Sequence, residues 1–559
     1  MSTTNVETIL AEVNRQLESA GELPAEVQLA IGMLLNVIEA ICADKRQLAD
    51  EVKRLRELLE QKKKGKTTAE DSENADSKKK DHSSEKQRRQ PPLLSSASDL
   101  PDPEPITIQE TRRVPIERAT LPADAKLVGI KSVVVQDIVI RPNNIQFELE
   151  VYYSPSLRKY YRAELPSGFD RGAFSGSLQA LIIALKYSGN MTEPKIRELL
   201  ANFDVRISAG SVSKILTNTA NEFTAELDEM VRAGLESTAY QQTDDTSARV
   251  AGKFWHTHIL CNPYYTAYFT KPHKDRLSVL EVLQNTEDLK FLLNSDTLRL
   301  LEQEFNLPKK WHEQLVALGE QTYDRGSLKQ LLDDWFGSRN QQLRTSIEHA
   351  MAIVYYRHQM SMPVVKTIVC DDAGQFKLLT ENLALCWIHQ GRHYAHLSPV
   401  VPHHREQMAA FQIRFWDYYR KLLVYGLSPS ADSSERLRAE FDELFSTKTG
   451  YADLDKLIAA TASKRPELLT LLHEVGTPPH NNRSELGARV SARRRDVSLH
   501  SVSHRGARAM DTFTSLTQTC RKLLVQPYRY FQDRLNRTFD IPPLASLIQS
   551  AAATSCSLA

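Results

Sequence analysis

Three strand-like runs between residues 237 and 272 constrain the fold of this chain more than any other feature. They read STAYQQTD, GKFWHTHILCN and YTAYFTKP, and a turn at Ala251-Gly252 separates the first two. Tightly linked strands of this kind predict an antiparallel meander. The β-branched run VVKTIVC, which ends before Asp371, and the run LALCWIH follow only after a long stretch of helical character. This alternation predicts an α/β layered core that helical insertions interrupt.

Length and composition set the class of protein. A chain of 559 residues is too long for one hydrophobic core and predicts about three or four domains. Its 41% hydrophobic and 25% charged residues exclude a disordered, collagen-like or disulfide-scaffold chain. The apolar run at 180–185 is far shorter than the ~20 residues of a membrane span, and the N-terminus has no signal-peptide pattern. Six scattered cysteines without a C-x-x-C pair suit a reducing compartment. We therefore expect a soluble, cytoplasmic protein with no membrane partner.

A heptad pattern occupies residues 31–59. Apolar side chains at a spacing of about 3.5 form a seam that one helix cannot bury alone, so self-association as a homodimer or higher oligomer is expected. The alternative is that this helix packs on its own protein. Residues 61–125 begin with a highly charged stretch and continue with repeated prolines, which predicts a flexible linker. The seam consists of Ile31, Leu34, Ile38, Ile41, Leu48, Val52, Leu55 and Leu59, with Lys45 in the remaining core position.

The next two segments predict a small β domain and a helical domain. Residues 126–170 contain three runs with the alternation of strands. Residues 171–232 are helical in pattern and include two helices across the short break DVRIS, with Ser208 as the expected N-cap of the second. Such a pair has the shape of a helix-turn-helix, whose second helix enters a DNA major groove, although an ordinary α-hairpin has the same pattern. The candidate DNA-binding residues on the second helix are Ser211, Ser213 and Lys214.

Three carboxylates stand out by their setting. Asp244 is expected at the end of the first meander strand, Asp371 at the end of VVKTIVC, and Glu485 in the first turn of a later helix. Strand ends at one edge of a sheet can bring two carboxylates together, and a crossing helix can add the third. Such a cluster would bind two Mg²⁺ or Mn²⁺ ions about 3.5–4 Å apart and support in-line phosphoryl transfer. Singly, each acid is as readily a turn or cap residue. Because strand side chains alternate, only one acid of Asp244-Asp245 and one of Asp371-Asp372 should face inward.

Basic residues gather toward the C-terminal end of the chain. Twelve Lys/Arg and four Asp/Glu lie between residues 483 and 537, although the whole chain has a net charge of only +1. Such clustering is typical of polyanion binding. The helix that carries Glu485 would present guanidinium groups to DNA phosphates, which they grip bidentately; a merely soluble basic helix is the alternative. The candidate phosphate ligands are Arg489, Arg493, Arg494 and Arg495.

A group of potential metal ligands follows the second aspartate. Cys386, His389, His393 and His396 are spaced so that they would share one face of a helix, and zinc accepts such ligands. Cys386, however, ends an apolar run that is typical of a strand, which would break the shared face. We therefore favour packing or active-site support for Cys386 and His389, and a phosphate contact for Arg392.

The order of these strings resembles the bacterial transposases of the insertion-sequence-66 family. The resemblance covers roughly residues 128–275 and 366–540. The matching strings are Leu185-Lys186-Tyr187, Asp244-Asp245-Thr246 with Arg249-Val250, Cys386-Trp387-Ile388-His389 with Arg392, Pro479-His480-Asn481-Asn482 with Glu485 and Arg489, and Ser503 with Gly506-Ala507.

The resemblance implies a ribonuclease-H-like core with an Asp-Asp-Glu triad. Such an enzyme uses Mg²⁺ or Mn²⁺ to cut transposon ends and to join the freed 3′-hydroxyl to target DNA. Carried over by position, the catalytic residues and metal ligands are Asp244, Asp371 and Glu485. The implied partners are transposon-end DNA and target DNA, with helper proteins as further candidates, at the nucleoid in a bacterial cytoplasm. The alternatives are a catalytically inactive DNA-binding relic or regulator with the same fold, and a structure-specific nuclease.

The chain departs from this family at several places. Asp245 stands where the family usually has Glu, and Asp372 stands where it has Gly, which makes the choice of Asp371 less direct. There is no cysteine between Cys42 and Cys261, so the family's zinc-binding segment is expected to be missing. The helical stretch between the first two aspartates is also longer than usual for the family.

These expectations divide the chain as follows. The parts are 1–60 (N-terminal helices and coiled coil), 61–125 (linker), 126–170 (small β domain), 171–232 (helix-turn-helix domain), 233–275 with 360–396 and 476–515 (catalytic core), 276–359 and 397–475 (helical insertions) and 516–559 (C-terminal helical tail).

Overall fold

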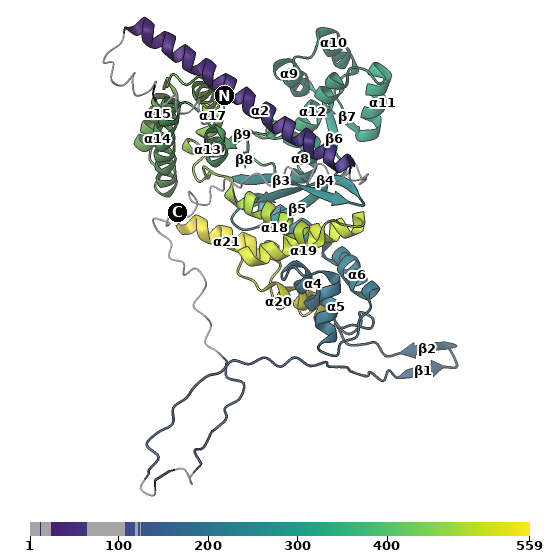
Figure 1. The fold of residues 1–559 in the computed structure, drawn as a ribbon. Helices are drawn as coiled ribbons and strands as arrows, with labels where there is room; N and C mark the ends of the chain where they lie inside the picture. Colours follow the sequence, from purple (N-terminus) through teal and green to yellow (C-terminus); the bar gives the residue numbers. More distant parts are fainter. Residues whose placement is uncertain (1–11, 13–23, 64–106, 118–120, 123–124, 559) are drawn as a thin grey trace.

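The computed structural model describes residues 12, 24–63, 107–117, 121–122 and 125–558 (Figure 1). Most of the expected linker 61–125 therefore lies outside the described residues. A mixed sheet lies at the centre of the body, with helices on either side of it (Figure 1). The chain thus has an α/β core with added helical parts.

The central sheet has five strands in the order β5-β4-β3-β8-β9. The expected meander is confirmed, since β3 (Tyr240–Val250), β4 (Lys253–Cys261) and β5 (Thr266–Lys271) pair antiparallel in sequence. The later strands β8 (Thr367–Cys370) and β9 (Asn382–Leu385) add parallel to β3. All four residues of β8 are buried, as expected for a parallel strand covered on both faces.

Helix α19 (His504–Lys522) covers the outer strand of this sheet. The backbone N–H groups of β5 that face away from β4 donate to side chains of α19: Thr266 to Thr519 Oγ1 at 3.1 Å, and Tyr268 to Ser515 Oγ at 2.9 Å. Thr270 donates likewise to Asp511 Oδ2 at 2.7 Å. An uncovered edge strand invites pairing with another chain, so these polar side chains close the sheet on this side.

The two insertions differ from each other. Residues 276–359 were expected to be wholly helical, but they also contain a two-stranded sheet of β6 (Lys290–Leu293) and β7 (Gln321–Asp324). Its helices are α8 (Arg276–Leu283), α9 (Ser295–Gln303), α10 (Lys309–Leu318), α11 (Arg325–Phe336) and α12 (Gln341–His358). Residues 397–475 are helical as expected, with α14 (Pro402–Leu427), α15 (Ala431–Phe445), α16 (Ala452–Ala462) and α17 (Arg465–Leu468).

The helical segment before the core has the expected pair of helices. These are α5 (Glu193–Ala201) and α6 (Ala209–Asn218), and Ser208 caps α6 by accepting from the Ser211 N–H. The flanking helices are α4 (Gly176–Tyr187), the short 3-10 turn η3 (Thr219–Phe223) and α7 (Thr224–Glu236). Helices α20 (Pro527–Asn536) and α21 (Leu544–Leu558) form the C-terminal tail.

The small β domain expected at 126–170 is reduced to one hairpin. Strands β1 (Val151–Ser154) and β2 (Lys159–Arg162) pair antiparallel and correspond to the second and third expected runs. The first run, residues 132–140, contains no strand. Its apolar side chains are largely exposed, as at Val133 and Val135, because no other layer covers them.

The N-terminal helix α2 (Ala25–Lys63) packs partly on its own protein. Leu35 is buried against Val400 and Val401 before α14, and Glu39 accepts from both of their N–H groups, Val401 at 3.0 Å. The side chains packed beside Leu35 are Ile31, Ile38 and Cys42. The alternative of intramolecular packing therefore holds for one side of the helix.

Much of α2 remains uncovered by the described part of the protein. Residues Ala25–Arg56 are long and apolar enough to cross a membrane by length and composition, contrary to the expectation that no segment is. The buried Glu39 and its contacts with the segment before α14 tie the helix to the protein body instead. The exposed apolar side chains in the heptad seam are Leu34, Ile41, Leu48, Val52 and Leu55.

Candidate active site

Asp244 lies in the middle of β3, not at its end as expected. The pairing of β3 with β8 stops at Gln242, opposite Val369, whereas β3 continues to Val250 alongside β4. Asp244 therefore lies where the parallel half of the sheet ends. Its Oδ1 accepts from the N–H of Asp245 at 2.8 Å.

Asp371 follows β8 directly, as expected, and its Oδ1 accepts from the N–H of Ala373 at 3.1 Å. The neighbouring acids have other partners. Asp372 pairs with Lys464 at 2.6 Å, and Asp245 accepts from Gln375 Nε2 at 3.0 Å. These contacts agree with the prediction that only one acid of each pair faces inward. They favour Asp371 over Asp372 as the inward-facing acid of the second pair.

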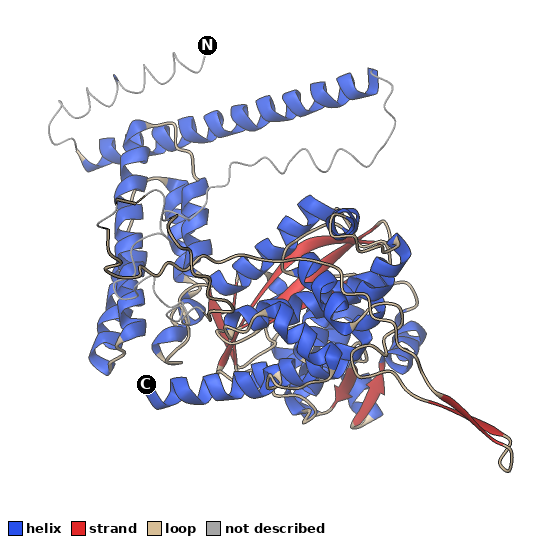
Figure 2. Ribbon diagram, turned by 90° about the horizontal axis from the view of Figure 1, so that it is seen from below, coloured by secondary structure: helices blue, strands red, loops and turns tan. Residues whose placement is uncertain are grey.

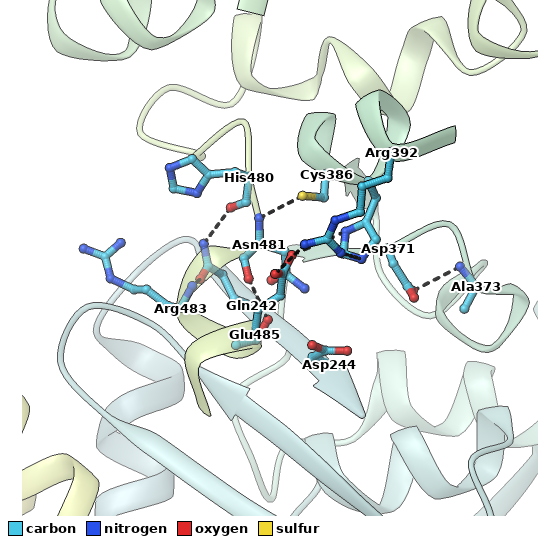
Figure 3. A network of polar contacts seen from close by, with 12 residues as sticks. Gln242, Asp244, Asp371, Ala373, Cys386, Arg392, His480, Asn481, Arg483 and Glu485 are labelled. Carbon is cyan, nitrogen blue, oxygen red and sulfur yellow. Dashed lines mark hydrogen bonds and ion pairs between the residues drawn. The ribbon is translucent and has the colours of Figure 1, made fainter. Parts of the chain in front are cut away.

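The start of α18 (Asn482–Ser498), which carries Glu485 in its first turn, is fixed to the sheet by a buried hydrogen-bond network. The side chain of Asn481 donates to the carbonyl of Thr243 at 2.7 Å, and its backbone N–H donates to Cys386 Sγ at 3.2 Å (Figure 3). Gln242 donates to the carbonyl of His480 at 3.1 Å and accepts from the Arg483 N–H at 3.2 Å. Neither amide was predicted to have this role, although Gln242 shares a strand face with Asp244 by the two-residue period.

The three acids, which are far apart in the sequence, lie near one another around the middle of β3, where the parallel half of the sheet ends (Figure 3). The pKa of Asp244 is raised to about 7, mainly by burial and also by the negative charges of Asp371 and Glu485, while the hydrogen bond from the Asp245 N–H opposes the shift. A cluster with this repulsion favours either a proton or a cation.

Glu485 already has a cation beside it. The guanidinium group of Arg392 donates from Nη2 to Glu485 Oε2 at 3.0 Å, and its Nη1 lies 3.1 Å from His389 Nε2. His389 Nδ1 lies 3.6 Å from Glu485 Oε1. The expected phosphate ligand Arg392 and the expected support residue His389 thus both contact the third carboxylate of the cluster.

Among the described residues, the potential ligand atoms of Cys386, His389 and Glu485 all lie within 4.8 Å of one another, whereas Asp244, Asp371 and Glu485 do not form so close a group. Zinc suits such donors. The arrangement of Arg392 argues against it, because Nε2 of His389 accepts from the guanidinium group, so Nδ1 carries the proton of the neutral ring. Burial raises the pKa of the Cys386 thiol to about 11, which also keeps the sulfur protonated without a metal. These contacts favour active-site support over a metal centre for Cys386 and His389.

The expected strand ends before Cys386, but it does not separate Cys386 from His389, whose ligand atoms lie within 4.8 Å of each other. Strand β9 ends at Leu385, and Cys386 is the N-cap of α13 (Trp387–His396). His393 and His396 are exposed and do not join the compact donor set.

The basic residues of α18 are divided by burial. Arg494 was expected to bind DNA, but it is buried and donates to the carbonyl of Tyr187 at 2.6 Å, so it joins α18 to α4. Arg495 is half-buried and donates to Thr246 Oγ1 at 3.0 Å and to the Ser247 carbonyl. Arg494 and Arg495 therefore support the fold. Arg489 is half-buried and Arg493 is exposed, so Arg493 is the most accessible of the four arginines.

The candidate residues of α6 also differ in exposure. Lys214 is exposed and Ser213 is half-buried. The Ser211 hydroxyl lies 2.9 Å from the Ser208 hydroxyl and belongs to the helix cap. Lys214 is thus the most accessible of the three.

No protein-family profile matches the chain. It is 31% identical over 341 residues to the "Uncharacterized protein y4jO" of Sinorhizobium fredii (strain NBRC 101917 / NGR234). The match covers 58% of this chain and 100% of that protein.

Proposed function

We propose that this chain, which belongs to the same family as protein y4jO of Sinorhizobium fredii, is a DNA transposase that cleaves transposon ends and joins the 3′-hydroxyl to target DNA. The observation that carries the proposal is the convergence of Asp244, Asp371 and Glu485, from β3, the end of β8 and the start of α18 (Figure 3). The sheet supports the ribonuclease-H-like fold implied by the resemblance, because only the second of its five strands in sequence, β4, runs antiparallel to the others.

The acidic cluster fits a hard divalent cation. Its donors are carboxylate oxygens, which Mg²⁺ and Mn²⁺ prefer, and the pKa of Asp244 is raised first by burial and then by the charges of Asp371 and Glu485, both of which a bound cation would offset. When bound, such ions lower the cost of the charge that develops on the attacking and leaving oxygens of a phosphodiester. Asp244, Asp371 and Glu485 would hold them.

The neighbouring residues have complementary tasks in this proposal. Arg392 neutralises Glu485 in the metal-free protein and, once a metal takes over that carboxylate, would be free to meet a DNA phosphate. Asn481 and Gln242 keep Glu485 at a fixed distance from β3. Water is the first nucleophile and a DNA 3′-hydroxyl the second.

The remaining parts of the molecule would hold DNA and a second copy. Lys214 on α6 and Arg493 on α18 are exposed cations for the phosphate backbone, which positions the duplex without reading its sequence. The exposed seam of α2 would join two copies. We place the enzyme at the bacterial nucleoid, where both its DNA partners lie.

The test is a Mg²⁺-dependent cleavage and joining assay on DNA that carries candidate inverted repeats from the sequence around the gene. Asp244→Asn, Asp371→Asn and Glu485→Gln should each lower cleavage by at least about 100-fold, the scale of losing one transition-state stabiliser, and leave salt-sensitive DNA binding in place. Asp245→Asn and Asp372→Asn are matched controls, because these acids have partners outside the cluster, and they should retain cleavage.

Other outcomes would replace the proposal. Absence of cleavage by the unmodified protein, with DNA binding intact, would indicate the inactive relic. Cleavage without joining would indicate a structure-specific nuclease. If Asp372→Asn abolished cleavage and Asp371→Asn did not, the second ligand would be Asp372.

A further inference from the structure

The β1–β2 hairpin projects from the body on an extended arm, in both views of the molecule (Figures 1 and 2). Its strands pair from Val151 opposite Arg162 to Ser154 opposite Lys159. Seven of its eight strand residues are exposed, so neither face of the ribbon packs on the described protein. An isolated two-stranded ribbon is marginally stable in water, and large side chains exposed on both of its faces call for a binding partner.

Tyrosines occupy both faces of this ribbon. Cross-strand partners share a face, so Tyr153 and Tyr160 lie on one side with ring centroids 4.7 Å apart. Tyr152 and Tyr161 lie on the other. Their exposed fractions are 65% for Tyr152, 50% for Tyr153, 71% for Tyr160 and 45% for Tyr161.

Each face also carries a cation beside its tyrosines. Arg162 is on the face of Tyr153 and Tyr160, and Lys159 is on the opposite face, where its Nζ lies 5.3 Å from the centre of the Tyr161 ring. With Arg158 at the turn, residues 151–163 have three basic residues and no acidic one, while Glu150 and Glu164 lie at the base of the ribbon, where Glu150 Oε2 accepts from the Tyr152 hydroxyl at 3.0 Å. The positive charge at the outer end of the ribbon favours a polyanionic partner.

The base of the arm is attached to the body. The rings of Phe147 and Phe169 contact each other at an angle with centroids 5.2 Å apart, and the Ser167 hydroxyl donates to the Asn536 carbonyl at 2.8 Å. Arg537 of the C-terminal tail pairs with Asp170 at 2.9 Å. The ribbon is therefore presented at a defined place rather than on a free chain end.

We propose that the β1–β2 hairpin binds unpaired DNA. Exposed aromatic rings next to cations form the kind of surface on which successive bases stack while the cations meet the phosphates. Paired bases hide their flat faces, so rings on an open ribbon gain most from a single strand. This site is separate from Asp244, Asp371 and Glu485, and it does not depend on the catalytic proposal.

The test measures binding of the full chain to labelled single-stranded and duplex oligonucleotides by fluorescence anisotropy, in EDTA so that catalysis plays no part. The variant Tyr153→Ser/Tyr160→Ser should bind the single strand at least about ten-fold more weakly and keep its duplex affinity. For the variant Arg158→Ala/Lys159→Ala/Arg162→Ala, we plot the logarithm of the single-strand binding constant against the logarithm of the salt concentration. The slope should become less steep by about 2, since each lost phosphate contact removes about 0.7 from it.

Two controls use exposed residues elsewhere. Arg436→Ala/Lys448→Ala/Lys456→Ala removes the same charge from the second helical insertion, and Tyr528→Ala removes a ring that is 37% exposed. Both should bind the single strand like the unmodified protein. Unchanged single-strand binding by the hairpin variants, or a loss confined to the duplex, would overturn the proposal. So would a change in mass by light scattering without a change in DNA binding, which would assign the ribbon to a second copy of the chain.

Discussion

At the scale of single residues, the carboxylates of the cluster are stabilised unequally. Glu485 has the guanidinium group of Arg392 at 3.0 Å, which compensates its charge. Asp244 instead lies against the charges of Asp371 and Glu485, and its burial and this repulsion together hold its pKa near 7. In the absence of a cation, the folded protein therefore loses free energy whenever Asp244 ionises.

Asp244→Asn should accordingly make the metal-free protein more stable at pH 8. The pKa rises from 3.8 in the unfolded chain to about 7 in the fold, so the folded carboxyl favours its proton, and the penalty grows as the pH increases from 4 through 7. The gain at pH 8 is on the order of 2–4 kcal/mol and should shrink toward zero near pH 4. Urea denaturation in EDTA at several pH values measures it.

Magnesium provides the counterpart of this experiment. Addition of Mg²⁺ at 100 times its dissociation constant should raise the free energy of unfolding of the unmodified protein by about 2.7 kcal/mol. The effect on Asp244→Asn should be far smaller. A variant no more stable than the parent at pH 8 would show that the Asp244 charge is already compensated.

Residue patterns predicted part of this site. The two-residue strand period correctly separates Asp244 from Asp245, because it depends only on local backbone geometry. The burial of Arg494 could not be predicted, since it depends on how α18 packs against α4 and α19, which are distant in the sequence. The role of Gln242 was missed for the same reason: its partners, His480 and Arg483, come from another segment.

At the scale of elements, the approach of α18 to the sheet positions Glu485. Gly487 allows this approach, because a Cβ atom there would lie 2.8 Å from Ile259 Cγ2 on β4 and 3.4 Å from the Tyr268 hydroxyl. The Tyr268 hydroxyl also donates to the Gly487 carbonyl at 3.1 Å. The helix is thus seated directly on the strand beside β3.

Gly487→Ala should therefore destabilise the protein by about 1–3 kcal/mol and reduce cleavage, because the added methyl group pushes α18 and Glu485 from the sheet. Gly426→Ala in α14 is the matched control: nothing lies within 4 Å of its Cβ position, and alanine should stabilise that helix by up to about 1 kcal/mol. Thermal unfolding of both variants compares them. Equal stability of the two would mean that α18 does not rest on Ile259.

Elements with a strong local pattern were predicted and weak ones were not. The meander and the cap of α6 at Ser208 follow from alternation and capping chemistry. Strands β6 and β7 have four residues each, too short to stand out within a helical stretch. Residues 132–140 have the composition of a strand but no neighbour to pair with, so the pattern alone was misleading.

At the scale of the whole molecule, α2 is held on one side by the protein and open on the other. Ile31, Leu35 and Ile38 face the segment before α14, whereas Ile41 and Leu48 are 61% and 65% exposed. Ile31 and Ile38 of the heptad seam are therefore covered by the body, whereas Leu34 and the positions from Ile41 to Leu55 stay available to a partner. The sequence pattern could not distinguish these two uses, because both require apolar residues at the same spacing.

A parallel pair of α2 helices is expected to make this protein a dimer. In the heptad register set by the seam, Glu51 and Arg56 occupy the flanking positions that face each other between parallel copies, so their charges are complementary. Leu48→Asp should dissociate the dimer, as measured by light scattering over a concentration series, because it places a charge in the exposed seam. Glu51→Arg should weaken association a few-fold, and Glu51→Arg/Arg56→Glu should restore it, since an exposed ion pair contributes about 0.2–1 kcal/mol. Association that survives Leu48→Asp would place the dimer contact elsewhere, and a double swap that failed to restore it would favour antiparallel helices.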